Sequence, residues 1–122
     1  MTREAIQHHI AKVYGCTPEY PWFKFKNYAV YRHSENRKWF LVVMDLPKRK
    51  FDIDEDGIID VINIKCDPVL IGSLLSEKGF FPAYHMNKGT WLSVLLDGIV
   101  DSEQIKGLID ISFNLTSKKT KP

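Results

Sequence analysis

The chain has 122 residues, of which 44% are hydrophobic and 26% are charged, a composition typical of one folded domain. Seventeen basic and 15 acidic residues leave a formal net charge of +2, a weaker basic excess than dedicated nucleic-acid-binding domains usually carry. No apolar run approaches the roughly 18 residues of a membrane span, and the start lacks a signal-peptide pattern, so we expect no membrane partner. Because Cys16 and Cys66 are too few for a disulfide framework, we expect a cytoplasmic protein.

The first half of the chain predicts one helix and two strands. Residues 3–14 place apolar side chains at helical spacing, and Gly15 stands where a helix C-cap is expected. Residues 25–33 are rich in β-branched and aromatic residues and predict a strand, and residues 38–46 predict a second strand that ends at Pro47. The second strand is apolar on both faces. This pattern fits either a central strand or a strand whose outer face contacts a second copy of the chain, and both remain open.

The second half predicts three more strands and two helices. Asp67 and Pro68 are a strong helix start, because Asp caps free amides and Pro suits the first helical position. Gly79 is expected to end this helix. The predicted elements are, in order, a strand at 58–66, a helix at 68–78, a short extended segment at 81–86, a strand at 90–96, and a last helix capped by Asp101 or Ser102.

The order of elements predicts the fold class. It reads α-β-β-β-α-β-β-α, and the short loops between successive strands require antiparallel pairing. Helices that cover one face of an antiparallel sheet bury the apolar side chains economically. We therefore predict a two-layer α+β fold, with helices on one face of the sheet. A single domain would span residues 1–116, followed by a flexible basic tail at 117–122.

Four segments carry a resemblance to a known family. They are Pro21-Trp22, YAVYRH at 28–33, VINIKCDPVLIGSL at 61–74 and PAYHMNKGTWLSVLLDG at 82–98. Together they resemble the MmcQ/YjbR-like family over residues 3–116. The resemblance implies a small α+β domain of the double-wing or secretion-chaperone-like kind. It also implies DNA binding, which is the role predicted for that family, without an established activity.

Strand alternation suggests where a ligand would bind. Asn63 and Lys65 share one face of the strand at 58–66, and Trp91 and Ser93 share one face of the strand at 90–96. We expect the apolar faces to meet the helices and these side chains to lie on an open face, where they would bind phosphates and stack on a base. A satisfied polar surface is the alternative. The candidate nucleic-acid-binding residues are Lys48, Arg49, Asn63, Lys65, His85, Asn87, Lys88 and Trp91.

One acidic connection mimics a calcium-binding loop. Asp52, Asp54 and Asp56 fall at its first, third and fifth positions, and Gly57 falls at its sixth. The twelfth position, where a bidentate Glu closes such a site, is Asn63, and the flanks predict strands where an EF-hand has helices. We therefore expect an acidic connection with solvated charges and no bound metal.

A catalytic cysteine is the remaining alternative. Cys66 stands just before a predicted helix, where amide dipoles lower a thiol pKa, and His85 would complete a Cys–His pair. Asp67 opposes a thiolate, however, and strand alternation turns Cys66 inward, so we expect a buried, inert cysteine and no enzymatic activity. No His or Cys spacing predicts zinc, and no cofactor is expected. The sequence thus favours a DNA-binding module, with a homodimeric protein-interaction or chaperone-like adaptor as the alternative.

Overall fold

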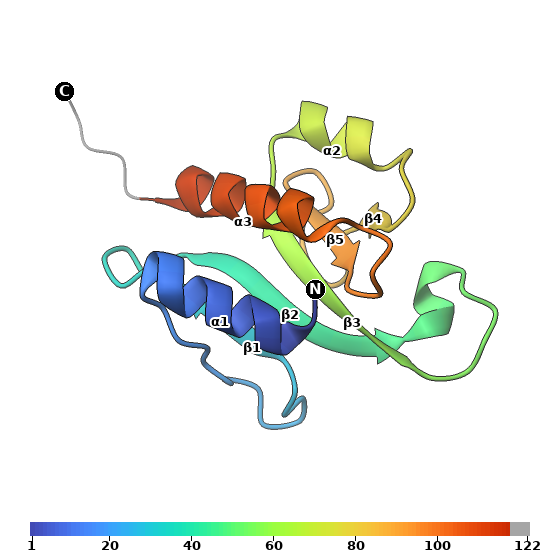
Figure 1. Cartoon of the computed structure of the whole chain (residues 1–122), viewed down its shortest axis with the longest axis horizontal. Coiled ribbons are helices and arrows are strands. Elements are labelled where there is room, and N and C mark those ends of the chain that lie inside the picture. The colour runs from blue at the N-terminus through green and yellow to red at the C-terminus, as the bar shows by residue number, and fades with distance from the viewer. Residues whose placement is uncertain (118–122) are drawn as a thin grey trace.

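The computed structural model describes residues 1–117, and within them the elements follow the predicted order (Figure 1). The helices are α1 (Arg3–Tyr14), α2 (Pro68–Leu74) and α3 (Ser102–Thr116), and a short 3-10 helix, η1, spans Lys48–Phe51. The strands are β1 (Ala29–Arg32), β2 (Trp39–Pro47), β3 (Ile58–Lys65), β4 (Phe80–Pro82) and β5 (Trp91–Leu95). These strands form one antiparallel sheet in the order β1-β2-β3-β5-β4, which confirms the α+β prediction. The tail predicted at 117–122 lies outside the described residues, apart from Ser117.

Side-chain caps explain where the helices begin. The Thr2 hydroxyl accepts a hydrogen bond from a backbone amide in the first turn of α1 at 3.0 Å. The Asp67 carboxylate accepts from two amides of α2, both at 3.0 Å, and Pro68 follows it at the first helical position. Asp101, rather than Ser102, caps α3 in the same way. The helix starts are therefore set by local side chains, as the sequence predicts for α2 and α3.

Helix α2 is shorter than predicted. It ends at Leu74, whereas the sequence pattern continues to Lys78. The Ser76 hydroxyl donates a hydrogen bond to the Ser73 carbonyl at 2.9 Å and competes there with the amide one turn ahead. The Glu77 amide bonds instead to the Leu74 carbonyl three residues back, so the chain tightens into a turn.

Two predicted strands are also shorter than expected. The segment at 25–33 pairs only from Ala29, because the Tyr28 amide closes a turn onto the Phe25 carbonyl at 3.0 Å. The segment at 81–86 leaves the sheet after Pro82, which has no amide hydrogen to continue the ladder. The unpaired residues of the two segments, 25–28 and 83–86, belong to connections that fold over the same face of the sheet.

The sheet buries apolar side chains on both of its faces. On one face they meet the helices, around Ile6 and Ile10 of α1 and Ile105 and Ile109 of α3, all of them 0% exposed. Figure 1 shows α1 and α3 crossing this face. The opposite face, which we call the loop side, holds a second buried cluster. Its members are Tyr28, Val30, Val42, Met44, Leu46, Phe51, Ile59, Val61 and Leu95.

The loop side corrects two expectations. Side chains from three connections, Trp22, Ile53 and Tyr84, pack onto its cluster, so the predicted open face is wrong. Strand β2 lies between β1 and β3, and its loop-side residues Val42 and Met44 are only 3% and 2% exposed. The apolar character of both faces of β2 is thus explained by burial within one chain, and it no longer supports a homodimer.

Candidate functional site

Only some of the predicted site residues lie at the surface. Asn63 is 0% exposed and Trp91 is 9% exposed, because the loop side is covered. The expectation that they offer an open surface for stacking and phosphate binding is therefore wrong. Lys65, which pairs with Trp91 in the register of β3 and β5, is half-buried. The exposed candidates between β4 and β5 are His85, Asn87 and Lys88.

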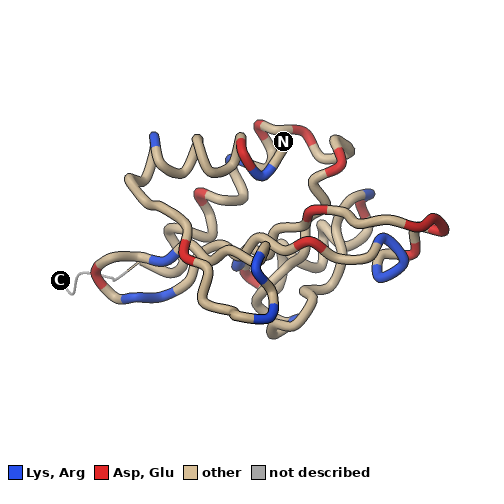
Figure 2. The backbone as a smooth tube through the Cα atoms, turned by 90° about the horizontal axis from the view of Figure 1, so that it is seen from below, with Lys and Arg blue, Asp and Glu red and all other residues tan. Residues whose placement is uncertain are grey.

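The basic residues before the acidic connection are already paired with it. The Lys48 ammonium contacts the Glu55 carboxylate at 2.6 Å, and this bond lowers the pKa of Glu55. The Arg49 guanidinium contacts Asp54 at 2.8 Å and Asp56 at 3.2 Å. Figure 2 shows this basic turn beside the acidic loop. Within residues 1–117, no three His, Cys, Asp or Glu side chains gather as metal ligands.

The predicted basic residues do not converge on one surface. Lys48 follows β2 at the end of the sheet where Pro47 pairs with Ile58, whereas Lys65 stands at the other end of β3. The strand from Ile58 to Lys65 spans roughly 23 Å at about 3.3 Å per residue. The side-chain oxygen of Asn87 accepts a hydrogen bond from the Gly89 amide at 2.8 Å, so Asn87 shapes the turn before β5.

A pocket of about 350 Å³ opens on the loop side instead, and we call it the aromatic pocket. This volume lies at the lower end of the range for small-molecule sites. Aromatic rings supply most of its wall, together with two methionines, whose flexible side chains adapt to a ligand. The lining residues are Trp22, Phe25, Tyr28, Trp39, Val42, Met44, Tyr84, His85 and Met86.

One wall of the aromatic pocket comes from the connection before β1. The Trp22 ring meets Trp39 edge-on, with centroids 5.5 Å apart, and Phe25 stacks on Tyr28 at 4.7 Å. The connection is attached to the sheet through Glu19, whose amide and carbonyl pair with the backbone of Val30 at 2.9 and 2.8 Å. These contacts hold the rings in place before any ligand arrives, which lowers the entropy cost of binding.

Buried polar groups hold the opposite wall. The Asn63 side-chain amide donates to the Tyr84 carbonyl at 2.8 Å, and the Tyr84 amide donates to the Ser93 hydroxyl at 3.0 Å. The Ser93 hydroxyl in turn donates to the Asn63 carbonyl oxygen at 2.6 Å. We call these three residues the Tyr84 clamp. The next residue, His85, adopts a left-handed φ of 62°, a conformation that costs a non-glycine residue energy and is common at functional sites.

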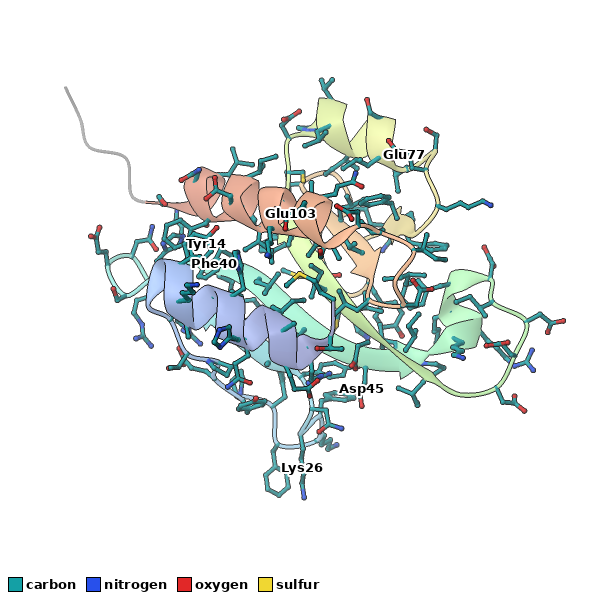
Figure 3. All side chains as sticks on the ribbon, viewed as in Figure 1. Tyr14, Lys26, Phe40, Asp45, Glu77 and Glu103 are labelled. Carbon is teal, nitrogen blue, oxygen red and sulfur yellow. The ribbon has the colours of Figure 1, made fainter. Side chains whose placement is uncertain are left out.

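An open hollow adjoins the aromatic pocket and carries positive charge. Phe25, Tyr28, Tyr84 and His85 line both spaces. The hollow adds three lysines, and the Lys50 ammonium lies 5.9 Å from the centre of the Tyr84 ring. Figure 3 shows Lys26 projecting from the tip of the connection before β1, and Asp45 at strand β2. The lysines that line the hollow are Lys24, Lys26 and Lys50.

The structure separates the two residues of the alternative catalytic pair. Cys66 packs in the helix-side core and is 1% exposed, whereas His85 lines the aromatic pocket on the loop side. Burial, and to a smaller extent the neighbouring Asp67 carboxylate, raise the pKa of the Cys66 thiol to about 11. The helix dipole does not overcome these two effects, so the arrangement provides no thiolate nucleophile next to His85.

Sequence reasoning missed most of the aromatic pocket, although a signal was present. The segment 20–28, YPWFKFKNY, places five aromatic residues in nine positions and interleaves them with two lysines. Interleaved basic and aromatic residues are typical of surfaces that bind single-stranded nucleic acid. Residues 25–28 read as the start of the strand predicted at 25–33, and that interpretation concealed the pattern.

Known proteins resemble this chain over almost its whole length. Residues 11–115 match the model of the YjbR family. A Bacillus subtilis (strain 168) relative, "Uncharacterized protein YyaQ", is 40% identical over 116 residues, which cover 95% of this chain and 98% of the relative. A crystal structure of a Pseudomonas syringae protein is 45% identical, with a TM-score of 0.93 over 96% of this chain and all of that one.

A more distant structure shares the fold. The crystal structure of Deinococcus radiodurans protein DR2400 is 22% identical and has a TM-score of 0.73, over 97% of this chain and 80% of that one. No helix among residues 1–117 is long and apolar enough to cross a bilayer; the cytoplasmic location stays a prediction. The similarity at the level of sequence and structure confirms the resemblance noted for the four segments. This chain belongs to the YjbR family.

Proposed function

We propose that the protein is a binding module without enzymatic activity, and that it binds single-stranded nucleic acid by taking an unpaired base into the aromatic pocket. The observation that carries this proposal is the preassembled set of rings from Trp22, Phe25 and Tyr84 around one pocket. Every base presents a flat π-face, so such a site accepts different sequences. In duplex DNA the bases are stacked and paired, and a pocket set into the protein surface takes one up only after it leaves the stack.

The charge distribution supports a single strand more than a duplex. The net charge is only +2, and the basic turn at Lys48 and Arg49 is occupied by its own acidic partners. The three lysines beside the aromatic pocket would contact few phosphates. Each phosphate contact on a single strand contributes about −0.7 to the slope of log K against log salt, so we expect a slope near −2.

Two phenylalanines of the same connection provide a matched test. Phe25 lines the aromatic pocket and is 48% exposed, whereas Phe23 is 91% exposed and does not line it. Binding of a fluorescein-labelled single-stranded oligothymidylate would be measured by anisotropy for Phe25→Ala, Phe23→Ala and the unchanged protein. Losing one stacking partner costs about 1–3 kcal/mol, so Phe25→Ala should weaken binding by roughly 5- to 150-fold.

Phe23→Ala should leave the affinity unchanged, and a duplex of the same length should bind more weakly than the single strand. Equal effects of the two substitutions would place the binding surface elsewhere.

The homodimeric adaptor is the less supported alternative, since β2 is covered within the chain. Light scattering tests it directly: a stable dimer at the concentrations of the binding assay would favour the adaptor, and a monomer would count against it.

A further inference from the structure

The aromatic pocket and the open hollow beside it share one wall. Phe25, Tyr28, Tyr84 and His85 line both spaces, so a ligand in one is in reach of the other without leaving the protein surface. The two spaces differ in chemistry. The aromatic pocket presents rings and methionine side chains, whereas the hollow presents the ammonium groups of three lysines.

The lysines of the hollow are available to a ligand. Within residues 1–117, none of Lys24, Lys26 and Lys50 forms an ion pair, in contrast to Lys48. The one carboxylate that lines the hollow belongs to Asp45, and it accepts a hydrogen bond from the Asn27 side chain at 3.0 Å. Three positive charges against one negative charge make the hollow attractive to an anion.

Lys50 stands at the boundary between the two spaces. Its ammonium lies 5.9 Å from the centre of the Tyr84 ring, which belongs to the shared wall. The adjacent Phe51 is 3% exposed and packs edge-on against Phe81 at 5.2 Å, so the turn that carries Lys50 is anchored in the loop-side core. The anchored turn fixes the backbone position of Lys50, so its ammonium stays within reach of both spaces.

We propose that the two spaces form one site for a nucleoside monophosphate unit, with the base in the aromatic pocket and its own phosphate in the hollow on Lys50. Lys24 and Lys26, which line the same hollow, would bind the neighbouring phosphates of a strand. This inference rests on the proposed function, because it assigns the base to the same pocket. The unit is either one nucleotide of a strand or a free mononucleotide. Both carry the same base and phosphate, and the test separates them.

Calorimetry with defined probes tests the phosphate position. Adenosine 5′-monophosphate, adenosine and inorganic phosphate would be titrated separately into the full chain. Adenosine 5′-monophosphate should bind about tenfold more tightly than adenosine, since a hydrogen bond to a charged group contributes at least this factor. Lys50→Gln should abolish that difference and leave adenosine binding unchanged. Lys12→Gln, at an exposed position on α1 on the helix side of the sheet, is the matched control and should change neither value.

The outcomes separate this inference from the proposed function. If the oligothymidylate binds and depends on Phe25 while adenosine and its monophosphate bind equally, the phosphate site is refuted and the function stands. If the monophosphate binds in a Lys50-dependent way and the oligothymidylate does not bind, the site stands as one for a free nucleotide and the function is refuted. If none of the probes binds, both are refuted.

Discussion

The Tyr84 clamp makes a quantitative prediction about the buried polar residue Asn63. In the Asn63→Ala variant, the Tyr84 carbonyl loses its donor at 2.8 Å and the Ser93 hydroxyl loses its acceptor at 2.6 Å. Both Asn63 and Ser93 are 0% exposed, so water does not replace these partners without a change in structure. The substitution therefore removes side-chain hydrogen bonds from the interior and from the wall of the aromatic pocket together.

The expected magnitude follows from the two groups left without a partner. Each unpaired buried polar group costs about 1–3 kcal/mol, and the Tyr84 carbonyl is only partly buried, so we expect a loss of about 2–4 kcal/mol. A domain of this size has a free energy of unfolding of about 5–15 kcal/mol, and the variant should therefore still fold. Asn114→Ala is the matched control, because Asn114 is exposed on α3 and its contact with Asp110 is long, at 3.4 Å.

Urea unfolding followed by circular dichroism measures both variants. Asn114→Ala should change the free energy of unfolding by no more than about 0.5 kcal/mol. Adding Ser93→Ala completes a double-mutant cycle, in which residues of one hydrogen-bond network couple by about 0.5–3 kcal/mol. An Asn63→Ala loss as small as that of the control, or strictly additive effects of Asn63 and Ser93, would refute the clamp.

Three further predictions concern other parts of the fold. A thiol reagent at neutral pH should leave Cys66 unlabelled in the native protein and label it in urea, since burial raises its thiol pKa to about 11; prompt native labelling would contradict this. Burial lowers the pKa of His33 below its ordinary 6.5, so the unfolded chain takes up the proton first. The contribution of His33 to stability should therefore be complete above pH 6.5 and be lost as the pH falls below it, so stability should fall less steeply in His33→Gln; parallel pH profiles would exclude this role. Gly79→Ala should destabilise the fold by more than 1 kcal/mol by chemical denaturation, because φ is +91° and the new Cβ would lie 2.6 Å from Val100. Gly107→Ala, in open space on α3, should stabilise it by about 0.5–1 kcal/mol, and equal effects at the two glycines would be evidence against this account.

The elements of this protein were predictable because local chemistry sets them. The carboxylate of Asp67 binds amides within its own first turn, and Pro68 suits that position wherever it occurs. The end of α2 was less predictable, because the Ser76 hydroxyl competes for a backbone carbonyl that a helical pattern leaves to an amide. Strand alternation correctly predicts that Asn63 and Trp91 lie on the face away from the helices. It does not predict that both side chains are buried there.

The candidate site was less predictable than the fold. Of the residues expected to bind nucleic acid, only His85 lines the aromatic pocket. Lys48 and Arg49 pair with acidic side chains that follow them closely in the chain, so this basic run is not the free positive surface that the sequence predicts. Strand alternation predicts an exposed amide at Asn63, whereas this side chain is buried and supports the pocket from inside through the Tyr84 carbonyl.

The sequence by itself determined the α+β class, the order of elements, the helix starts and the family, because these depend on neighbours along the chain. Tertiary structure alone decided what covers the loop side. Alternation tells which side chains share a face, but it does not tell which connection folds over that face. Trp22 and Tyr84 are far apart in sequence and form one pocket only because β1 and β4 attach their connections to opposite edges of the same sheet. The loop-side face between those edges is apolar. Both connections pack onto it because this contact removes apolar surface from water.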